Sequence, residues 1–144
     1  MKPVEDVLGA VGFSVMTVRP GDTALAMGLS DLPVVATSHL LHAMESATIA
    51  ALSEFLDQGE TTFLLSTSIN LLASAQVGDE LRANARCSNI EPRTTPHALG
   101  QFVLTFQCDI YEGKRHIAEA EIKRATVERV TFLARTAAES LLKS

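Results

Sequence analysis

The chain has 144 residues, of which 47% are hydrophobic, 20% are charged and 5% are aromatic, and its formal net charge is −5. This length fits a single domain, 1–144, with a core of aliphatic side chains. The acidic balance argues against a nucleic-acid partner, because proteins that bind nucleic acid carry a basic field. No apolar run reaches the length of a membrane span, and Glu5 and Asp6 stand where a secretion signal is apolar. We therefore expect no membrane partner and a cytoplasmic location.

The two cysteines, Cys87 and Cys108, lie in strand-like runs, and neither belongs to a CxxC pair or a Cys/His cluster. We interpret both as small buried hydrophobic residues. A structural zinc site would need clustered thiolates or imidazoles. The sequence therefore predicts no metal and no resident cofactor.

The first half of the chain predicts a strand from about Gly12, a turn at 20–22, a second short strand to about Met27, and a long helix. The helix runs from about Ser38 to Leu56, with Thr37 or Ser38 as its N-cap. Its apolar stripe recurs every three or four residues, as expected for one buried helix face. The members of this stripe are Leu41, Met44, Thr48, Leu52 and Phe55.

The second half predicts four strands and a short helix. The strands span about Thr61–Ala75, Asp79–Ile90, Phe102–Tyr111 and His116–Val127, and the C-terminal helix spans about 132–142. The strand after Asp79 alternates between an apolar and a polar face. A hairpin turn is expected at 112–114.

One helix can cover only one face of such a sheet. The elements therefore predict an α+β, hot-dog fold, in which a long central helix is wrapped by a curved antiparallel sheet, with a core of about 12–130. Domains of this kind pair edge to edge, so we expect a homodimer or a tetramer built from it.

The segment that begins at Leu32 and ends at Glu45 reads LPVVATSHLLHAME. It resembles the V-x-A-T…M-E segment of the fluoroacetyl-CoA thioesterase-like branch of hot-dog proteins. Weaker similarities are those of Ala75–Leu81 to the P-V-G-x-x-V turn of that family and of Lys123–Val127 to its E-R-x-V strand end. The order and spacing hold from about Ser14 to Val130.

The resemblance implies a thioesterase that acts on small acyl-CoA esters, with a Thr, a Glu and a His near the thioester carbonyl. The Thr corresponds to Thr37 and the Glu to Glu45, with the family's spacing of eight. The position of the His falls on Leu71, with Asn70 adjacent. Of the family's G-x-G-x-H-x-R pattern in the last strand, this chain keeps only the Arg, as Arg124.

From the residues alone, Glu45 lies on or beside the apolar stripe of the helix. A carboxylate there could activate water as a general base or attack a thioester directly, or it could simply reach solvent at the edge of the stripe. Thr37 could face the thioester or cap the helix. Ser38 is expected to contact substrate, beside free backbone N–H groups that could hold an oxyanion.

His42 precedes Glu45 by three residues and could replace the missing His as a proton carrier, or it could lie on an exposed flank of the helix. A metal held by His39, His42 and Glu45 is disfavoured, because their spacing does not converge on one helix face. Asn70 could orient water or donate to an oxyanion, and Leu71 could line the substrate site.

Arg124 is expected to bind coenzyme A, together with Lys123, Arg82 and Arg86, unless these charges are only solvated. His97 lies in a loop, 92–100, that could shape a substrate entrance.

The sequence thus predicts an acyl-CoA thioesterase-like protein that hydrolyses a small acyl-CoA, with coenzyme A present only as part of the substrate. The alternative is a non-catalytic hot-dog domain that binds an acyl-CoA or a related small ligand. A hydratase of the same fold is disfavoured, because the Asp and His pair of such enzymes is absent from the helix start. A purely structural module is the remaining alternative.

Overall fold

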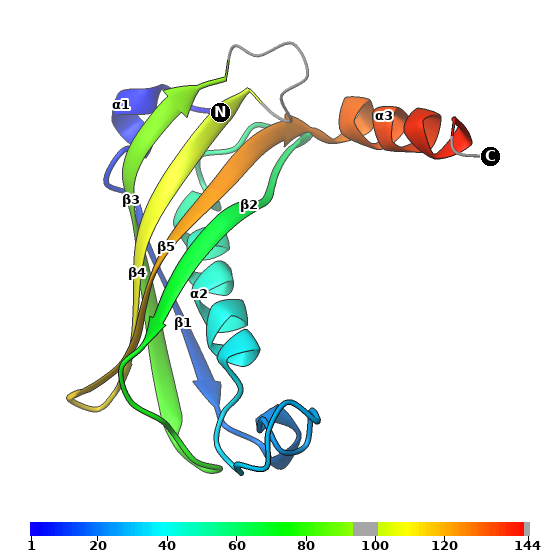
Figure 1. The fold of residues 1–144 in the computed structure, drawn as a ribbon. Coiled ribbons are helices and arrows are strands. Elements are labelled where there is room, and N and C mark those ends of the chain that lie inside the picture. Colours follow the sequence, from blue (N-terminus) through cyan, green and yellow to red (C-terminus); the bar gives the residue numbers. More distant parts are fainter. Residues whose placement is uncertain (94–100, 143–144) are drawn as a thin grey trace.

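The computed structural model describes residues 1–93 and 101–142. Its element order is helix, strand, helix, four strands and a last helix (Figure 1). The elements are α1 (Val4–Val7), β1 (Val11–Thr17), a 3₁₀ turn (Pro20–Asp22), α2 (Thr37–Leu52), β2 (Glu60–Leu71), β3 (Glu80–Pro92), β4 (Phe102–Glu112), β5 (Arg115–Glu128) and α3 (Arg129–Leu141).

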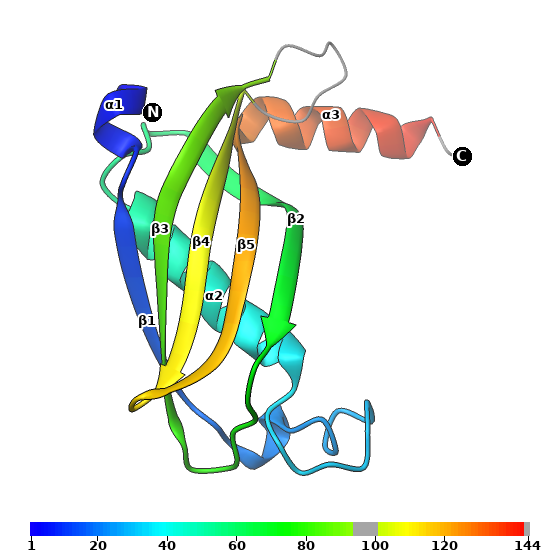
Figure 2. The ribbon, with the colours of Figure 1, turned by 60° about the vertical axis from the view of Figure 1, so that its left-hand side comes forward.

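The five strands form one antiparallel sheet in the order β1-β3-β4-β5-β2. The sheet is curved, and α2 lies against its concave side (Figures 1 and 2). This is the predicted hot-dog fold. β1 and β2 are the two edge strands, and α3 projects away from the sheet in both views.

The alternation of side chains gives the sheet two distinct surfaces, which we call the helix-side face and the outer face. The residues of β3 that point to the helix-side face are Leu81, Ala83, Ala85 and Cys87, and all four are buried. Arg82 and Arg86 of the same strand point to the outer face and are exposed. The alternation in the sequence therefore reports directly which residues meet α2.

α2 packs against β1 with almost no space between the two backbones. A Cβ atom on Gly12 would stand 2.1 Å from the carbonyl oxygen of Ala47 and 2.3 Å from the amide nitrogen of Ala51. Because glycine has no Cβ, only this residue allows so close an approach. The short alanine side chains of α2 at this crossing complete the contact.

Several predicted boundaries need correction. The second short strand before Met27 is absent, because residues 23–30 form turns, with a single bridge between Thr23 and Val35. α2 ends at Leu52 rather than at Leu56, and its N-cap is Ala36, which offers no side-chain cap. The capping role predicted for Thr37 or Ser38 is therefore wrong. The strand predicted to reach Ala75 ends at Leu71.

The last helix starts three residues earlier than the sequence indicated. The side chain of Glu128 caps it by accepting hydrogen bonds from the amides of Val130 and Thr131. Hydrogen bonding from the side chain of Thr131, then from the amides of Thr131 and Val130, holds the pKa of the Glu128 carboxyl below its ordinary value. Within the described part of the chain, no helix combines the length and the apolar character that crossing a bilayer requires.

Candidate active site

The centre of the candidate site is an ion pair between Glu45 of α2 and Arg124 of β5. Nη1 of Arg124 donates to Oε1 of Glu45 at 2.9 Å. The same guanidinium donates from Nε to the hydroxyl of Thr62 at 2.9 Å and from Nη2 to the carbonyl oxygen of Thr62 at 3.1 Å. Helix and sheet are thus joined by one polar cluster of three residues.

The strand pattern explains why Arg124 reaches the helix. It stands on the helix-side face of β5, opposite Leu64 of β2, and only 5% of its surface is exposed. A buried guanidinium is stable only where its N–H groups find acceptors, and Glu45 and Thr62 supply them. The adjacent Lys123 points to the outer face and is exposed.

The carboxylate of Glu45 is bonded to Arg124 but remains partly exposed to solvent. Its side chain keeps 29% of its surface exposed. Among the described residues, Oε2 of this carboxylate accepts no hydrogen bond, while Oε1 is bound to Arg124. A carboxylate oriented by a cation and open to solvent can take a proton from water or approach an electrophilic carbon.

A groove of about 420 Å³ adjoins this cluster, between the end of α2 and the start of β2. Thr62 and Arg124 line it on the polar side, and Ile49, Leu52 and Leu56 supply an apolar side. The combination of an apolar wall and a few convergent polar groups is typical of a site for a small ligand.

Thr37 and Ser38 lie at the start of α2, and both are exposed. Eight residues along an α-helix correspond to a rise of about 12 Å, so Thr37 does not meet Glu45 within one chain. The Ser38 hydroxyl lies 3.9 Å from the sulfur of Met27. The structure therefore places Thr37 and Glu45, both predicted to be catalytic, at separate points along the helix.

The two histidines of α2 lie on another flank. His42 and His39 line a groove of about 550 Å³ with Ser14 of β1 and Asp22. Nε2 of His39 stands 3.7 Å from Oδ1 of Asp22. Within the described residues no hydrogen bond joins His42 to Glu45, whose carboxylate turns to Arg124 instead. The predicted His42–Glu45 pair is thus not formed.

Asn70 and Leu71 stand on opposite faces of β2. Leu71 is opposite Ala118 on the helix-side face and is 50% exposed, whereas Asn70 is opposite Glu119 on the outer face. Within one chain the sheet therefore lies between Asn70 and Glu45, so the role predicted for Asn70 in orienting water or holding an oxyanion would need a site on the outer face or in a second copy of the chain. The apolar lining predicted for the position of Leu71 agrees with its face.

The predicted basic cluster is also divided by the sheet. Arg82, Arg86 and Lys123 project from the outer face, whereas Arg124 points to α2. The guanidinium of Arg124 donates its hydrogen bonds to Glu45 and Thr62, so in this structure its partners are protein groups. The 92–100 loop and His97 lie largely outside the described residues, and His97 itself is not described.

The two thiols are not candidate nucleophiles. Burial raises the pKa of Cys87 to about 11 and that of Cys108 to about 12. Both are free and buried, as predicted. Since the thiolate is the reactive form, neither cysteine is activated at neutral pH.

Sequence reasoning missed Thr62 and the pairing of Glu45 with Arg124. A signal for the pair was present: a carboxylate beside an apolar stripe needs a partner, and Arg124 is a cation at an inward position of its strand. Thr62 carries no comparable signal, because its role depends on the register between β2 and β5.

Comparison with solved structures supports the fold. The chain superposes on the fluoroacetyl-CoA thioesterase FlK with a TM-score of 0.77 and 20% identity, covering 90% of this chain and 94% of that one. A hypothetical protein of Thermus thermophilus, described as a thioesterase superfamily member, superposes with a TM-score of 0.80 and 23% identity, and the match covers the whole of both chains. A hot-dog-like protein of Thermanaerovibrio acidaminovorans superposes with a TM-score of 0.79 and 15% identity, covering 94% of this chain and 95% of that one.

Identities this low establish a shared fold only. No curated protein matches the sequence. The family model of the fluoroacetyl-CoA-specific thioesterase, FlK, does match, over residues 18–130. This span holds α2, all of β2 to β5 and the Glu45–Arg124 pair. The chain therefore belongs to the fluoroacetyl-CoA-specific thioesterase family.

Proposed function

We propose that this protein hydrolyses a small acyl-CoA thioester, with Glu45 as the group that acts at the carbonyl carbon. The observation that carries the proposal is the state of the Glu45 carboxylate. It is held at one oxygen by a buried arginine and is partly exposed, and its partners Arg124 and Thr62 line a groove of ligand size. Membership of a thioesterase family supports the same reaction class.

Two routes fit this arrangement. In the first, Glu45 removes a proton from a water molecule, the water attacks the carbonyl carbon, and the coenzyme A thiolate leaves. In the second, the carboxylate attacks the carbon itself, the thiolate leaves, and water hydrolyses the resulting anhydride. In both routes Arg124 acts as a positioning residue. Water is the second substrate, and no resident cofactor is needed.

The separation of Thr37 from Glu45 supports a homodimeric site. If both residues serve one thioester, they must come from two copies of the chain, because about 12 Å of helix separates them in one copy. β2 is an edge strand, and its last residue, Leu71, and the following Leu72 are each about half exposed, as expected of a surface that pairs with a second copy.

A second candidate is a domain that binds an acyl-CoA without hydrolysing it. The observation that favours it is Leu71, an apolar side chain on the helix-side face at the position where the family's His is expected. If that His is indispensable, Glu45 and Arg124 would serve only to bind the thioester.

The deciding experiment follows thiol release from a panel of short-chain and aryl acyl-CoAs. Loss of a general base typically lowers the rate by about 10²-fold or more, and we expect this for Glu45→Ala and Glu45→Gln. Glu121→Gln, on the outer face, is the matched control and should retain full activity. Binding of acyl-CoA without turnover by the wild type would favour the second candidate.

A mixing experiment tests the shared site. Thr37→Ala and Glu45→Ala chains are each expected to be inactive, but co-refolding them should restore activity. Each mixed dimer then holds one site with an intact Thr37 from one chain and an intact Glu45 from the other. Failure of every mixture to regain turnover would place both residues in one chain's site, whereas full turnover by the Thr37→Ala chain alone would remove Thr37 from the chemistry.

A further inference from the structure

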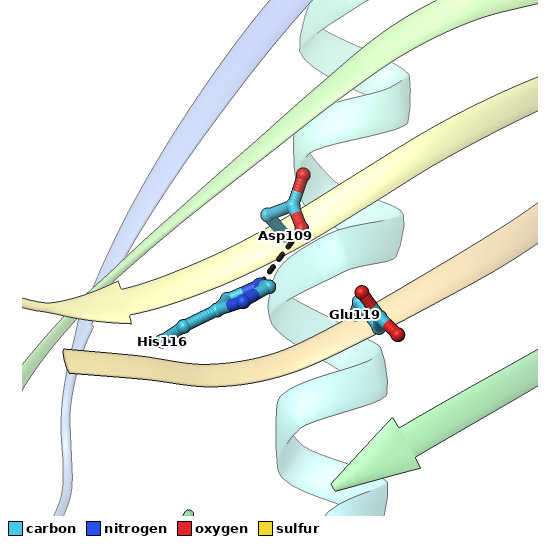
Figure 3. Close-up of side chains that lie close together, drawn as sticks. All are labelled: Asp109, His116 and Glu119. Carbon is cyan, nitrogen blue, oxygen red and sulfur yellow. Dashed lines mark hydrogen bonds and ion pairs between the residues drawn. The ribbon is translucent and has the colours of Figure 1, made fainter. Parts of the chain in front are cut away.

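The geometry points to a second site, on the outer face of the sheet, that binds a divalent transition-metal ion through Asp109, His116 and Glu119. Figure 3 shows the three side chains gathered on β4 and β5, with α2 behind the sheet. One potential ligand atom from each residue lies within 4.8 Å of the other two. The site is separate from Glu45, which belongs to α2 and meets Arg124 on the opposite side of the sheet.

The distances suit metal coordination. Nε2 of His116 lies 2.8 Å from Oδ1 of Asp109. Two neighbouring ligands of an octahedral ion, each about 2.1 Å from the metal, are separated by about 3.0 Å. An ion could therefore replace the bridging proton with little movement of these two residues. Glu119 is exposed, so its carboxylate can rotate toward the same point.

A β-bulge creates this arrangement. In a regular strand, His116 and Glu119 are three residues apart and would point to opposite faces. The pairing between β4 and β5 shifts from Ile110↔Ala118 to Tyr111↔His116, so Ile117 is the extra residue. Both Ile117 and Ala118 are buried, and His116 turns to the outer face beside Glu119. Bulges of this kind re-aim side chains, often near functional sites.

The charges of the outer face also favour a cation. Asp109 and Glu119 stand directly opposite each other across the β4–β5 ladder, an arrangement in which like charges destabilise a sheet. Arg82 and Arg86 of β3 are opposite Tyr111 and Gln107, not opposite Asp109. A bound divalent ion would relieve the repulsion between the two carboxylates.

The imidazole is oriented for this role. The ring of Tyr111 stacks on His116 with centroids 4.6 Å apart and planes 13° apart, which fixes the direction of Nε2. A groove of about 400 Å³, lined by Asp109, Glu119 and Asn70 among others, leaves room for water ligands. One imidazole and two carboxylates suit Mn²⁺, Co²⁺ or Zn²⁺ better than Mg²⁺ or Ca²⁺, which prefer all-oxygen ligands.

The test measures binding of Zn²⁺ and Mn²⁺ to the full chain without a polyhistidine tag, by calorimetry and by the electron paramagnetic resonance of Mn²⁺. We expect one ion per chain and a higher melting temperature in its presence. Glu119→Gln and His116→Gln should each weaken binding by about 10-fold or more, the size expected when a ligand or its close support is lost.

Two controls make the result decisive. Glu121→Gln removes a carboxylate from the same face of the same strand, and His42→Gln removes an imidazole from α2. Both should leave the affinity unchanged. The proposal is overturned if no saturable binding occurs at millimolar metal, or if Glu119→Gln, an exposed substitution that should not disturb folding, binds as tightly as the wild type. Thioester hydrolysis is measured separately and need not change in Glu119→Gln or His116→Gln.

Discussion

Strand β5 carries two polar clusters that differ in how their charges are satisfied. On the helix-side face, Arg124 is buried and meets Glu45 and Thr62 through three hydrogen bonds. On the outer face, His116 meets Asp109 through one, and Glu119 stands beside them in solvent. A buried charge must find its partners within the chain, whereas an exposed cluster can take them from water or a dissolved ion.

This difference indicates what each face can tolerate. The helix-side face combines close packing with a complete set of polar partners, so a single change there should be costly. The outer face has room and solvent, so a change there should affect binding more than folding. Three comparisons test this contrast, and they are ordered from the largest expected effect to the smallest.

The largest effect is expected at the crossing of α2 and β1. Gly12→Ala places a methyl group 2.1 Å from the Ala47 carbonyl oxygen, so the helix must move away from the strand. Since backbone cannot yield as a flexible side chain can, we expect a loss of about 3 kcal/mol or more in the free energy of unfolding. Urea denaturation at fixed protein concentration measures it.

Gly21→Ala is the matched control, because a Cβ there would meet no atom within 4 Å. Its unfolding free energy should stay within about 0.5 kcal/mol of the wild type. Equal stability of the two variants would show that α2 does not pack on β1 as closely as described.

A smaller effect is expected from two adjacent residues of β5 that point to opposite faces. Arg124→Met removes the buried cation and leaves Glu45 and Thr62 without their partner. Breaking a fully buried pair costs about 3–5 kcal/mol, but Glu45 is partly exposed and can recruit water. We therefore expect a loss of about 2 kcal/mol, measured by the same urea titration.

Lys123→Met provides the comparison, with the same new side chain one residue away on the outer face. It should change the unfolding free energy by no more than about 0.5 kcal/mol. If both substitutions had the same small effect, the Glu45–Arg124 pair would contribute nothing to the joint between helix and sheet.

The smallest effect is expected at Asn70. Because this side chain points away from Glu45, Asn70→Ala should alter kcat/KM for thioester hydrolysis by about twofold or less. Leu71→Ala, its neighbour on the helix-side face, should change KM severalfold if that face receives substrate. A large loss of kcat/KM in Asn70→Ala, but not in Leu71→Ala, would indicate that the thioester site includes the outer face.

The sequence predicted the sheet well where each strand is buried on one side only. Leu81, Ala83, Ala85 and Cys87 alternate with exposed residues, and that period both identifies β3 and assigns its faces. The prediction failed where buried and exposed residues do not alternate regularly along the chain. Residues 23–30 are turns whose composition, with Leu25, Met27 and Leu29, mimics an apolar strand although these side chains are exposed.

For the candidate site, the family resemblance identified Glu45 and Arg124 separately but not their contact. Their contact depends on where α2 crosses the sheet, and no short-range pattern encodes a crossing point. The grouping of Asp109, His116 and Glu119 was also invisible, because it depends on a bulge. A strand pattern read with a strict period of two assigns His116 to the wrong face.

The bulge at Ile117 also affects how related sequences should be compared. Ile117 and Ala118 point inward one after the other, where a regular strand has a single inward residue, so His116 and Arg124 keep their faces whether or not the extra residue is present. A relative that lacks one residue here would still present its arginine to the helix and its histidine to the outer face, with the histidine two residues before the glutamate instead of three. An alignment of related sequences should therefore allow a one-residue gap at this point before it treats the histidine of the outer cluster as lost.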